Sequence, residues 1–375
     1  MPQAIRYTID YTVVIEPTTP QELAQALASC YADGKRIRLT GQGTKAGMGG
    51  PVTEADVSIS TRGLNRVLQY EPRDLTVSVE SGASFSELTA LLAQHRQMLP
   101  LDPPFGPDAT VGGVLASNQS GPRRRLYGTA RDMVIGMTLA TLEGKLVKTG
   151  GMVVKNVAGL DLSKLMVGSF GTLAAMAVVN FKVAPIPPAT RSFVRRFKSA
   201  GEAMAARDYL IRGVLQPAAI DVEKGADGYR LLVQAGGNAA VLDRYSREFS
   251  GAEVLEGEAE EALWRGVREF TPEFLKHCPE GAVVRISCSL TQMAAVLDAL
   301  PGPAIARAGS GVVYGCFERA GDAAGRELIE FAPQAFRENN ELWAAPGDDF
   351  ATMQRVKGML DPRGLLNRGR LFGRI

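Results

Sequence analysis

The chain is poor in the residues that build metal sites. Its 375 residues include only four cysteines and two histidines, namely Cys30, Cys278, Cys288, Cys316, His95 and His277. The cysteines are widely separated and form no CxxC pair, which argues against iron–sulfur and structural zinc sites. A mononuclear site with two histidine ligands would need both histidines, from distant segments. We therefore expect no bound metal, and we expect free thiols in a reducing compartment.

The chain also lacks long apolar runs and an excess of one charge. No segment approaches the roughly 18 consecutive apolar residues of a membrane-spanning helix. Residues 1–12 contain no apolar stretch like that of a secretory signal, which favours a cytoplasmic protein. Lys and Arg number 42 against 40 for Asp and Glu, and this near balance argues against nucleic acid as a partner.

What the first half does contain is an alternation of helices and strands. Thr19, Pro20 and Glu22 are typical of a helix start, and Gly34 can end that helix in a left-handed conformation. A second helix is expected after Ser84. Strands are predicted at 36–40, 56–60, 75–80, in a hairpin around Glu143 and Gly144, and at 174–185.

The stretch APIPPATR at 184–191 is the best domain boundary, because its prolines disfavour both helix and central strand. Beyond it, two strand–helix–strand–strand–helix–strand series are predicted, at 192–257 and 282–346. Such units favour an α+β domain with a mostly antiparallel sheet.

Three glycine-rich segments are the candidates for a ligand site. In GQGTKAGMGG (41–50), which follows a strand, glycines let several backbone N–H groups converge on an anion such as pyrophosphate. DATVGGVLASNQSG (108–121) joins a glycine pair to small residues that allow a planar ligand to approach the backbone. KNVAGLDLSKLMVGSFGTLA (155–174) places two glycines in a turn before a strand. Each alone also fits an ordinary turn or helix start.

Their order along the chain resembles the flavin-binding domain of the vanillyl-alcohol oxidase / p-cresol methylhydroxylase (PCMH) family. The matching motifs are GQGTKAG, DATVGGVLASNQSG with a later Tyr127-Gly128, GSFGTLA, and a C-terminal DPRGLLNRGR. The resemblance covers nearly the whole chain and is most specific over 36–185. Within the family, SGPRRRLYGTARD and VKNVAGLDLSKLMVGSFGTLA are most similar to the FAD-binding E-type subunits of bacterial glycolate oxidase (glycolate dehydrogenase).

The resemblance implies an α+β fold with a PCMH-type FAD-binding domain of two α+β subdomains at 1–186. A smaller α+β domain would follow at 187–375, with its end, 361–375, returning to the flavin domain. The first loop would hold the FAD pyrophosphate, and the other segments would lie along the flavin. The implied FAD-binding residues are Gly41, Gln42, Gly43, Thr44, Lys45, Thr110, Gly112, Gly113, Asn118, Gly121, Gly168, Gly171, Thr172, Leu173, Asn367 and Arg370. The chain departs from the family pattern at Leu160, Ala174 and Arg368.

Some family members attach FAD covalently through a His or Cys near the first loop or in the second domain. No His or Cys lies between Tyr31 and Gln94, so we expect FAD to be bound non-covalently. Related hydroxyacid dehydrogenases use second-domain histidines to bind metal and take the substrate proton, whereas this chain offers only His277 there, at an expected helix end or surface. We therefore assign no catalytic residue and expect the chain alone not to oxidise glycolate or D-lactate at a useful rate.

The arginine run 123–125 is open to two interpretations. Guanidinium groups can clamp a carboxylate or a partner's acidic surface, but an exposed run is also a common solvated edge. The leading hypothesis for function is the FAD-binding subunit of a glycolate oxidase complex, which relays electrons or supports assembly. Its partners would be a catalytic flavin subunit and an iron–sulfur subunit, with peripheral contact at the inner face of the membrane left open. The alternatives are a stand-alone FAD-dependent hydroxyacid or alcohol dehydrogenase with its own tyrosine or carboxylate base, and a structural subunit without flavin redox function.

Overall fold

The computed structural model describes residues 13–52, 54–153, 161–373 and 375. Its first layer is a small parallel sheet of order β1-β3-β2. Helix α1 packs on this sheet through Leu23 and Leu27, which are fully buried. Thr19 caps α1 by accepting from the Glu22 N–H at 3.1 Å, and Gly34 follows the helix end with a φ of +69°. The bounds are β1 Val13–Ile15, α1 Pro20–Ala32, β2 Ile37–Thr40 and β3 Val57–Ser60.

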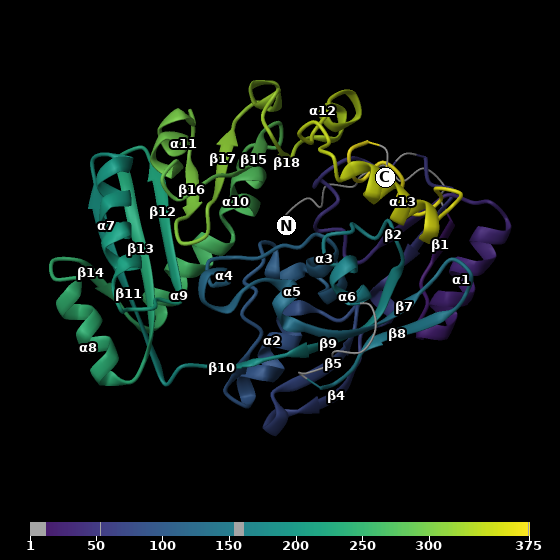
Figure 1. The fold of residues 1–375 in the computed structure, drawn as a ribbon, viewed down its shortest axis with the longest axis horizontal. Coiled ribbons are helices and arrows are strands. Elements are labelled where there is room, and N and C mark those ends of the chain that lie inside the picture. Colours follow the sequence, from purple (N-terminus) through teal and green to yellow (C-terminus); the bar gives the residue numbers. More distant parts are fainter. Residues whose placement is uncertain (1–12, 53, 154–160, 374) are drawn as a thin grey trace, which may run out of the picture.

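A five-stranded antiparallel sheet of order β4-β5-β9-β7-β8 forms the second layer of the first half. Helices α2 and α3 cover its inner face through a shared apolar core, and Figure 1 shows them in blue beside the sheet. A two-stranded ribbon, β6 with β10, joins residues 97–98 to residues 184–185. The bounds are β4 Val67–Glu71, β5 Thr76–Glu80, α2 Phe85–Gln94, β6 Gln97–Met98, α3 Val111–Ala116, α4 Arg124–Tyr127, α5 Ala130–Met133, β7 Val134–Ala140, β8 Leu146–Gly150, α6 Leu162–Met166, β9 Ala175–Lys182 and β10 Ala184–Pro185.

The second half is built on one eight-stranded sheet of order β14-β11-β13-β12-β16-β17-β15-β18, in which every neighbouring pair is antiparallel. Helices α7, α8 and α11 bury one face. On the other face, α9 contributes Trp264 to a core that also contains Phe170 of the first half. The bounds are β11 Ala189–Phe197, α7 Ala200–Arg212, β12 Ala219–Gly225, β13 Gly228–Gly237, α8 Ala239–Glu248, β14 Glu253–Leu255, α9 Gly257–Arg268, α10 Phe270–His277, β15 Ala282–Ser287, α11 Met293–Ala299, β16 Ala304–Arg307, β17 Val312–Phe317 and β18 Ile329–Phe331.

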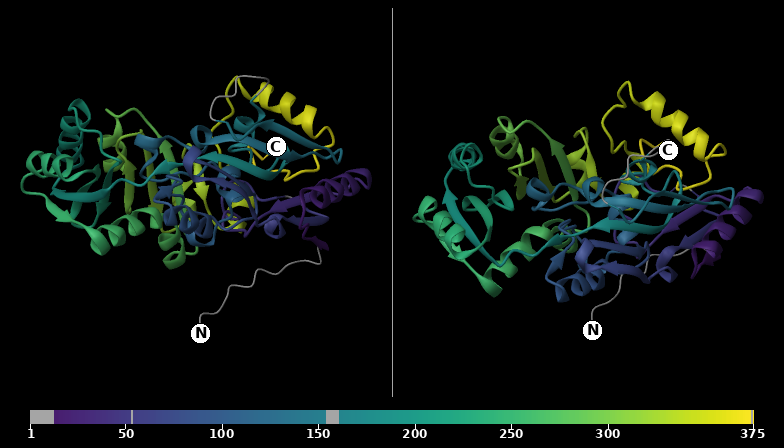
Figure 2. Two further views of the ribbon diagram at one scale, coloured as in Figure 1. Left: turned by 90° about the horizontal axis from the view of Figure 1, so that it is seen from below. Right: turned by 60° about the horizontal axis from the view of Figure 1, so that its bottom comes forward.

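The last segment leaves this sheet and lies against the first half. It contains α12 (Gln334–Asn339) and α13 (Phe350–Leu360), drawn in yellow in Figures 1 and 2. After α13, Leu366 forms a parallel bridge with Ile37 of β2, and the Ile37 N–H donates to Leu365 O at 2.7 Å. The α+β fold class is confirmed, with a mainly antiparallel second half.

Three details of the sequence prediction were wrong. The second repeat unit runs strand–helix–strand–strand–strand–helix, because β18 precedes α12 and residues 340–346 contribute only an isolated bridge at Trp343. Helices α9 and α10 were not predicted. The prolines of 184–191 also do not exclude strands, since β10 and the start of β11 both fall there, with Pro185 on a short two-stranded ribbon where proline is tolerated.

Candidate functional site

The first glycine loop leaves β2 and turns toward solvent. Gln42 and Gly43 are exposed, and Gly43 has a φ of +78° with no atom within 4 Å of where a Cβ would stand. The amide N–H groups of residues 42–45 donate no hydrogen bond within the described part of the chain. A run of unpaired amides beside an open glycine is the kind of cradle that accepts a phosphate oxygen.

Lys45 turns back from this loop into the protein. Its Nζ donates to Thr44 Oγ1 at 3.1 Å and to Pro104 O at 3.3 Å, and it stands 5.3 Å from the centre of the Phe105 ring. Burial lowers the pKa of this amine to about 8. Glu269, between α9 and α10, supplies a nearby negative charge and accepts from the N–H groups of Phe105 and Gly106. Lys45 therefore lies at the junction of the two halves.

The second glycine segment starts directly beside the first loop. Thr110 caps α3 by accepting from the Gly113 N–H at 3.1 Å, and a Cβ on Gly41 would lie 2.3 Å from its hydroxyl. Gly112 packs against the Ser81 carbonyl, with a Cβ-to-oxygen distance that would be 2.9 Å. Ser81 Oγ is buried without a hydrogen-bond partner in the described residues. The close approach of Gly41 to Thr110 brings the two segments together.

The end of the second segment divides into two environments. Asn118 is exposed, has a φ of +50° and packs beside Gly168 of the third segment. Gly121 is buried, and a Cβ there would lie 2.1 Å from the carbonyl oxygen of Asp102. Gly121 is thus required for close packing of the chain against Asp102.

The third segment is held by the C-terminal motif. Asn367 accepts from the Leu39 N–H at 2.8 Å and donates to Phe170 O at 2.7 Å, so one buried amide joins the end of β2 to the glycine turn. A Cβ on Gly171 would lie 2.8 Å from that amide nitrogen. Thr172 is fully buried, and its carbonyl accepts from Lys357 Nζ at 2.7 Å, while Leu173 joins the core of the five-stranded sheet.

Arg370 completes the C-terminal contact. Its guanidinium donates to Lys45 O at 3.1 Å and to Ala46 O at 3.4 Å, and it lies over the Phe170 ring at 5.2 Å. Burial lowers its pKa to about 10, which leaves it cationic at neutral pH. The structure thus gathers the first loop, the start of the second segment, the glycine turn of the third segment and the C-terminal motif around the end of β2. Residues 155–160, the start of the third segment, lie outside the described residues, and Leu160, one of the departures from the family pattern, is among them.

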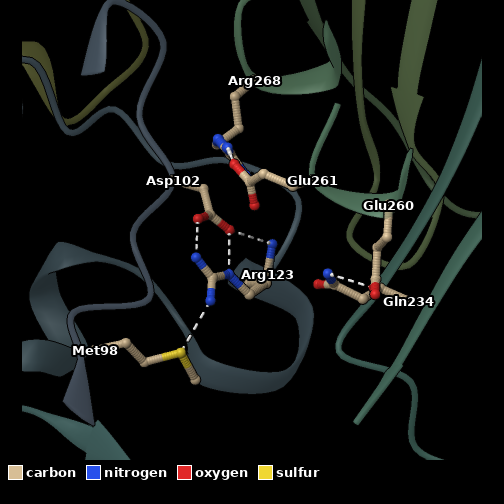
Figure 3. Close-up of polar contacts among 7 residues, drawn as sticks. All are labelled: Met98, Asp102, Arg123, Gln234, Glu260, Glu261 and Arg268. Carbon is tan, nitrogen blue, oxygen red and sulfur yellow. Dashed lines mark hydrogen bonds and ion pairs between the residues drawn. The ribbon is translucent and has the colours of Figure 1, made fainter. Parts of the chain in front are cut away.

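The arginine run is not a solvated edge. Arg123 Nε donates to Asp102 Oδ2 at 2.6 Å, and a second guanidinium nitrogen pairs with Oδ1. Burial raises the pKa of the Asp102 carboxyl, but the guanidinium outweighs burial and holds that pKa below its usual value. Figure 3 shows this pair facing Arg268 and Glu261 of the second half. Arg125 donates to Gln216 Oε1 and Pro217 O, both at 3.3 Å. Arg125 therefore bonds across the junction of the halves, whereas Arg123 is paired within the first half.

Sequence reasoning missed a buried polar cluster on the eight-stranded sheet. Glu330 of β18 is 4% exposed, accepts from Gln119 Nε2 at 3.2 Å, and its carbonyl accepts from the Gly49 N–H at 3.0 Å. Burial raises the pKa of its carboxyl to about 7. Arg307 of β16 pairs with Asp221 of β12, and both are almost fully buried. The available signal was a single charged residue in each of two otherwise apolar strands, Arg307 in AIAR and Glu330 in IEF.

His277 ends α10, is exposed, and its Nδ1 lies 2.7 Å from Glu273 O, as expected for a helix-end histidine. Among the described residues, no cluster of three or more His, Cys, Asp or Glu side chains is placed to hold a metal ion. No helix in the described ranges is long and apolar enough to cross a membrane.

Fold and site together define an FAD-binding protein of the PCMH type. Residues 11–150 match the family model described as FAD binding domain. Solved alkyldihydroxyacetonephosphate synthase shares the fold, with a TM-score of 0.70 at 18% identity over 94% of this chain and 75% of that one.

The chain belongs to the GlcE family of glycolate oxidase subunits. It is 32% identical to glycolate oxidase subunit GlcE of Escherichia coli over 364 residues, which cover 95% of this chain and 98% of the relative. It is also 28% identical to glycolate oxidase subunit GlcD of Bacillus subtilis, over 56% of this chain and 44% of that protein. The chain is therefore an FAD-dependent oxidoreductase of the hydroxyacid oxidase family.

Proposed function

We propose that this chain is the FAD-binding subunit of a glycolate (2-hydroxyacid) oxidase complex. It works beside a catalytic flavin subunit and an iron–sulfur subunit, and it relays electrons or supports assembly. The single observation that carries this proposal is the similarity to GlcE, which extends over nearly the full length of both chains. The similarity to GlcD covers only 56% of this chain and 44% of that protein, which fits two related flavin chains that differ over the rest of their length.

The residues around β2 suit a non-covalently held FAD. The unpaired amides of the first loop receive the pyrophosphate, and Arg370 fixes that loop through two of its carbonyl groups. Asn367 sets the distance between β2 and the glycine turn, where flavin contacts are expected. FAD, when bound, supplies the capacity to accept and pass on electrons.

Purification from the native host tests the proposal. A tagged chain, expressed from its own locus, is expected to bring down a second flavoprotein and an iron–sulfur chain in fixed ratio. The preparation should reduce a dye with glycolate, whereas the isolated FAD-loaded chain should show no rapid anaerobic flavin bleaching. A chain that purifies alone and is bleached by glycolate without any partner would refute the proposal.

A variant without flavin separates the two roles within the complex. Gly43→Val is expected to lose FAD, and Gly325→Val is its control because Gly325 has a φ of +77° and equally open surroundings far along the chain. If the Gly43 variant assembles with its partners but the complex loses glycolate turnover, the flavin relays electrons. Full turnover with this variant would instead assign the chain a structural role.

A further inference from the structure

A short segment of the flavin-binding half, residues 104–106, is held from two sides. From the first glycine loop, Lys45 Nζ donates to Pro104 O at 3.3 Å and lies 5.3 Å from the centre of the Phe105 ring. From the second half, the Glu269 carboxylate accepts from the N–H groups of the next two residues, at 3.0 and 3.2 Å. The segment therefore connects the loop proposed to hold the FAD pyrophosphate with the second half of the protein.

Phe105 has a backbone conformation that depends on these contacts. Its φ of +58° lies in the left-handed region, which a bulky side chain rarely adopts. Successive N–H groups next to such a residue form an anion-binding nest, and the Glu269 carboxylate occupies it. The Phe105 ring also packs against Phe331 of β18, with ring centres 5.5 Å apart. Strained residues of this kind persist where the surrounding structure fixes them, and they cluster at functional sites.

The Lys45 amine is buried beside neutral acceptors. The residue is 8% exposed, and within the described residues its hydrogen-bond acceptors are Thr44 Oγ1 and Pro104 O. It forms no ion pair with a carboxylate in that part of the chain. Burial lowers the pKa of the amine from 10.5 to about 8. Near that pH, about half of the molecules without FAD therefore carry a neutral Lys45.

The charged groups around Lys45 come from three parts of the chain. Glu269 lies between α9 and α10, and Asp108 lies in a short 3₁₀ turn; both carboxylates raise the pKa of Lys45 without offsetting its burial. Arg370, in the C-terminal segment, donates to the Lys45 carbonyl oxygen at 3.1 Å. Burial raises the pKa of Glu269, and Arg268 beside it opposes this rise. A further negative charge on the loop would favour the protonated form of Lys45.

We propose that Lys45 is a proton-linked positioning residue which, together with Glu269, couples FAD binding to the contact between the two halves. Where Lys45 is neutral, binding of the pyrophosphate at the first loop is accompanied by uptake of a proton from solvent at Nζ. The ammonium then binds Pro104 O more strongly and attracts the Glu269 carboxylate across residues 104–106. The inference rests on the proposed FAD-binding role of the first loop and is independent of the partner subunits.

FAD affinity should fall as the pH rises above about 8. Well below that pH, Lys45 is protonated with or without FAD, so the affinity is constant. At higher pH, binding has to restore the proton, and the affinity should be about tenfold lower at pH 9 than at pH 7 when Lys45 stays protonated in the complex. The uptake should be about 0.5 proton per FAD at pH 8 and about 0.9 at pH 9.

Calorimetric titration of the apoprotein with FAD at pH 7, 8 and 9 measures both quantities. Each titration is run in two buffers of different ionisation enthalpy, so that the difference in heat gives the number of protons taken up. Equal affinity at pH 7 and pH 9, with no proton uptake, would overturn the proposal while leaving FAD binding intact. A chain that binds no FAD at any of these pH values would instead contradict the proposed role of the first loop.

Lys45→Met keeps the length of the side chain and removes its charge. This variant should bind FAD at least tenfold more weakly than the wild type at pH 7, without proton uptake and without a further loss of affinity toward pH 9. Lys45→Arg should keep the wild-type affinity of pH 7 up to pH 9, because a guanidinium does not titrate in this range. Lys148→Met, at an exposed lysine of β8, is the control. Proton uptake that persists in Lys45→Met would assign the proton to another group and sink the idea, even if the larger arginine does not fit.

Glu269→Gln tests the link to the second half. Gln keeps an oxygen for the Phe105 N–H but removes a charge that raises the pKa of Lys45. The fall in FAD affinity should therefore begin at a lower pH than in the wild type, whereas the same change in a Lys45→Met background should leave the pH profile flat. Glu258→Gln, at an exposed carboxyl in the first turn of α9, is the control. A wild-type pH profile in Glu269→Gln would refute the coupling between the halves.

Discussion

Replacing Glu330 by Gln should stabilise the folded protein at alkaline pH and change little at acidic pH. The carboxyl is buried against Gln119 and the sheet, and burial raises its pKa from 4.5 to about 7. At about 1.4 kcal/mol per pKa unit, this rise corresponds to about 3 kcal/mol between the two protonation states. Gln keeps the shape and can still accept from the Gln119 amide.

The direction follows from proton linkage. Below pH 4.5, the Glu330 carboxyl is protonated in both the folded and the unfolded chain. Its ionisation therefore does not lower the stability of the wild type relative to the variant there. Between 4.5 and about 7, the unfolded chain releases its proton while the folded chain keeps it, so wild-type stability falls as pH rises. Above about 7 both states are ionised, and the full difference of about 3 kcal/mol is present.

Denaturant unfolding of FAD-saturated protein at pH 5, 6, 7 and 8, followed by circular dichroism, measures this difference. The free energy of unfolding of Glu330→Gln minus that of the wild type should grow by about 2–3 kcal/mol from pH 5 to pH 8. Steric effects of the substitution are independent of pH and cancel in this comparison. Glu318→Gln, an exposed carboxyl after β17, is the control. A difference that stays constant from pH 5 to pH 8 would refute the reasoning.

Three further outcomes are expected. The purified protein should be yellow and release intact FAD on acid or heat denaturation, and flavin that stays with the precipitate would contradict non-covalent binding. Gly43→Val should lower FAD content and with it the melting temperature, because FAD at 100 times its dissociation constant stabilises the folded protein by about 2.7 kcal/mol. The control Gly325→Val should lose only about 1–3 kcal/mol of stability, through backbone strain. Gly121→Ala should destabilise the chain by about 1–3 kcal/mol or more even without FAD, because its Cβ would meet the Asp102 carbonyl at 2.1 Å; Gly266→Ala, in open surroundings within α9, should be neutral or stabilising.

Local chemistry made much of the first half predictable. Capping at Thr19 and Ser84 and alternation in the strands are short-range signals, and both helices begin where these residues predict. The glycine segments were recognisable because their order along the chain carries information that each segment alone lacks. Their mutual contacts, such as Gly41 with Thr110, are long-range facts that no local pattern contains.

The second half was less predictable because its sheet combines both repeat units. The isolated bridge at Trp343 depends on pairing with Leu328, and periodicity alone could not show that residues 340–346 would form nothing longer. The buried cluster was missed for a related reason. Arg307 looks like an ordinary charge at the end of a short strand until the sheet order places it on the face toward the flavin half.

The position of Glu330 links the cluster to the cofactor loop. Its carbonyl accepts from the Gly49 N–H, at the end of the first glycine loop, and its side chain accepts from Gln119, at the end of the second segment. One residue of β18 thus contacts both flavin segments, so ordering of these segments by FAD also fixes the carboxyl.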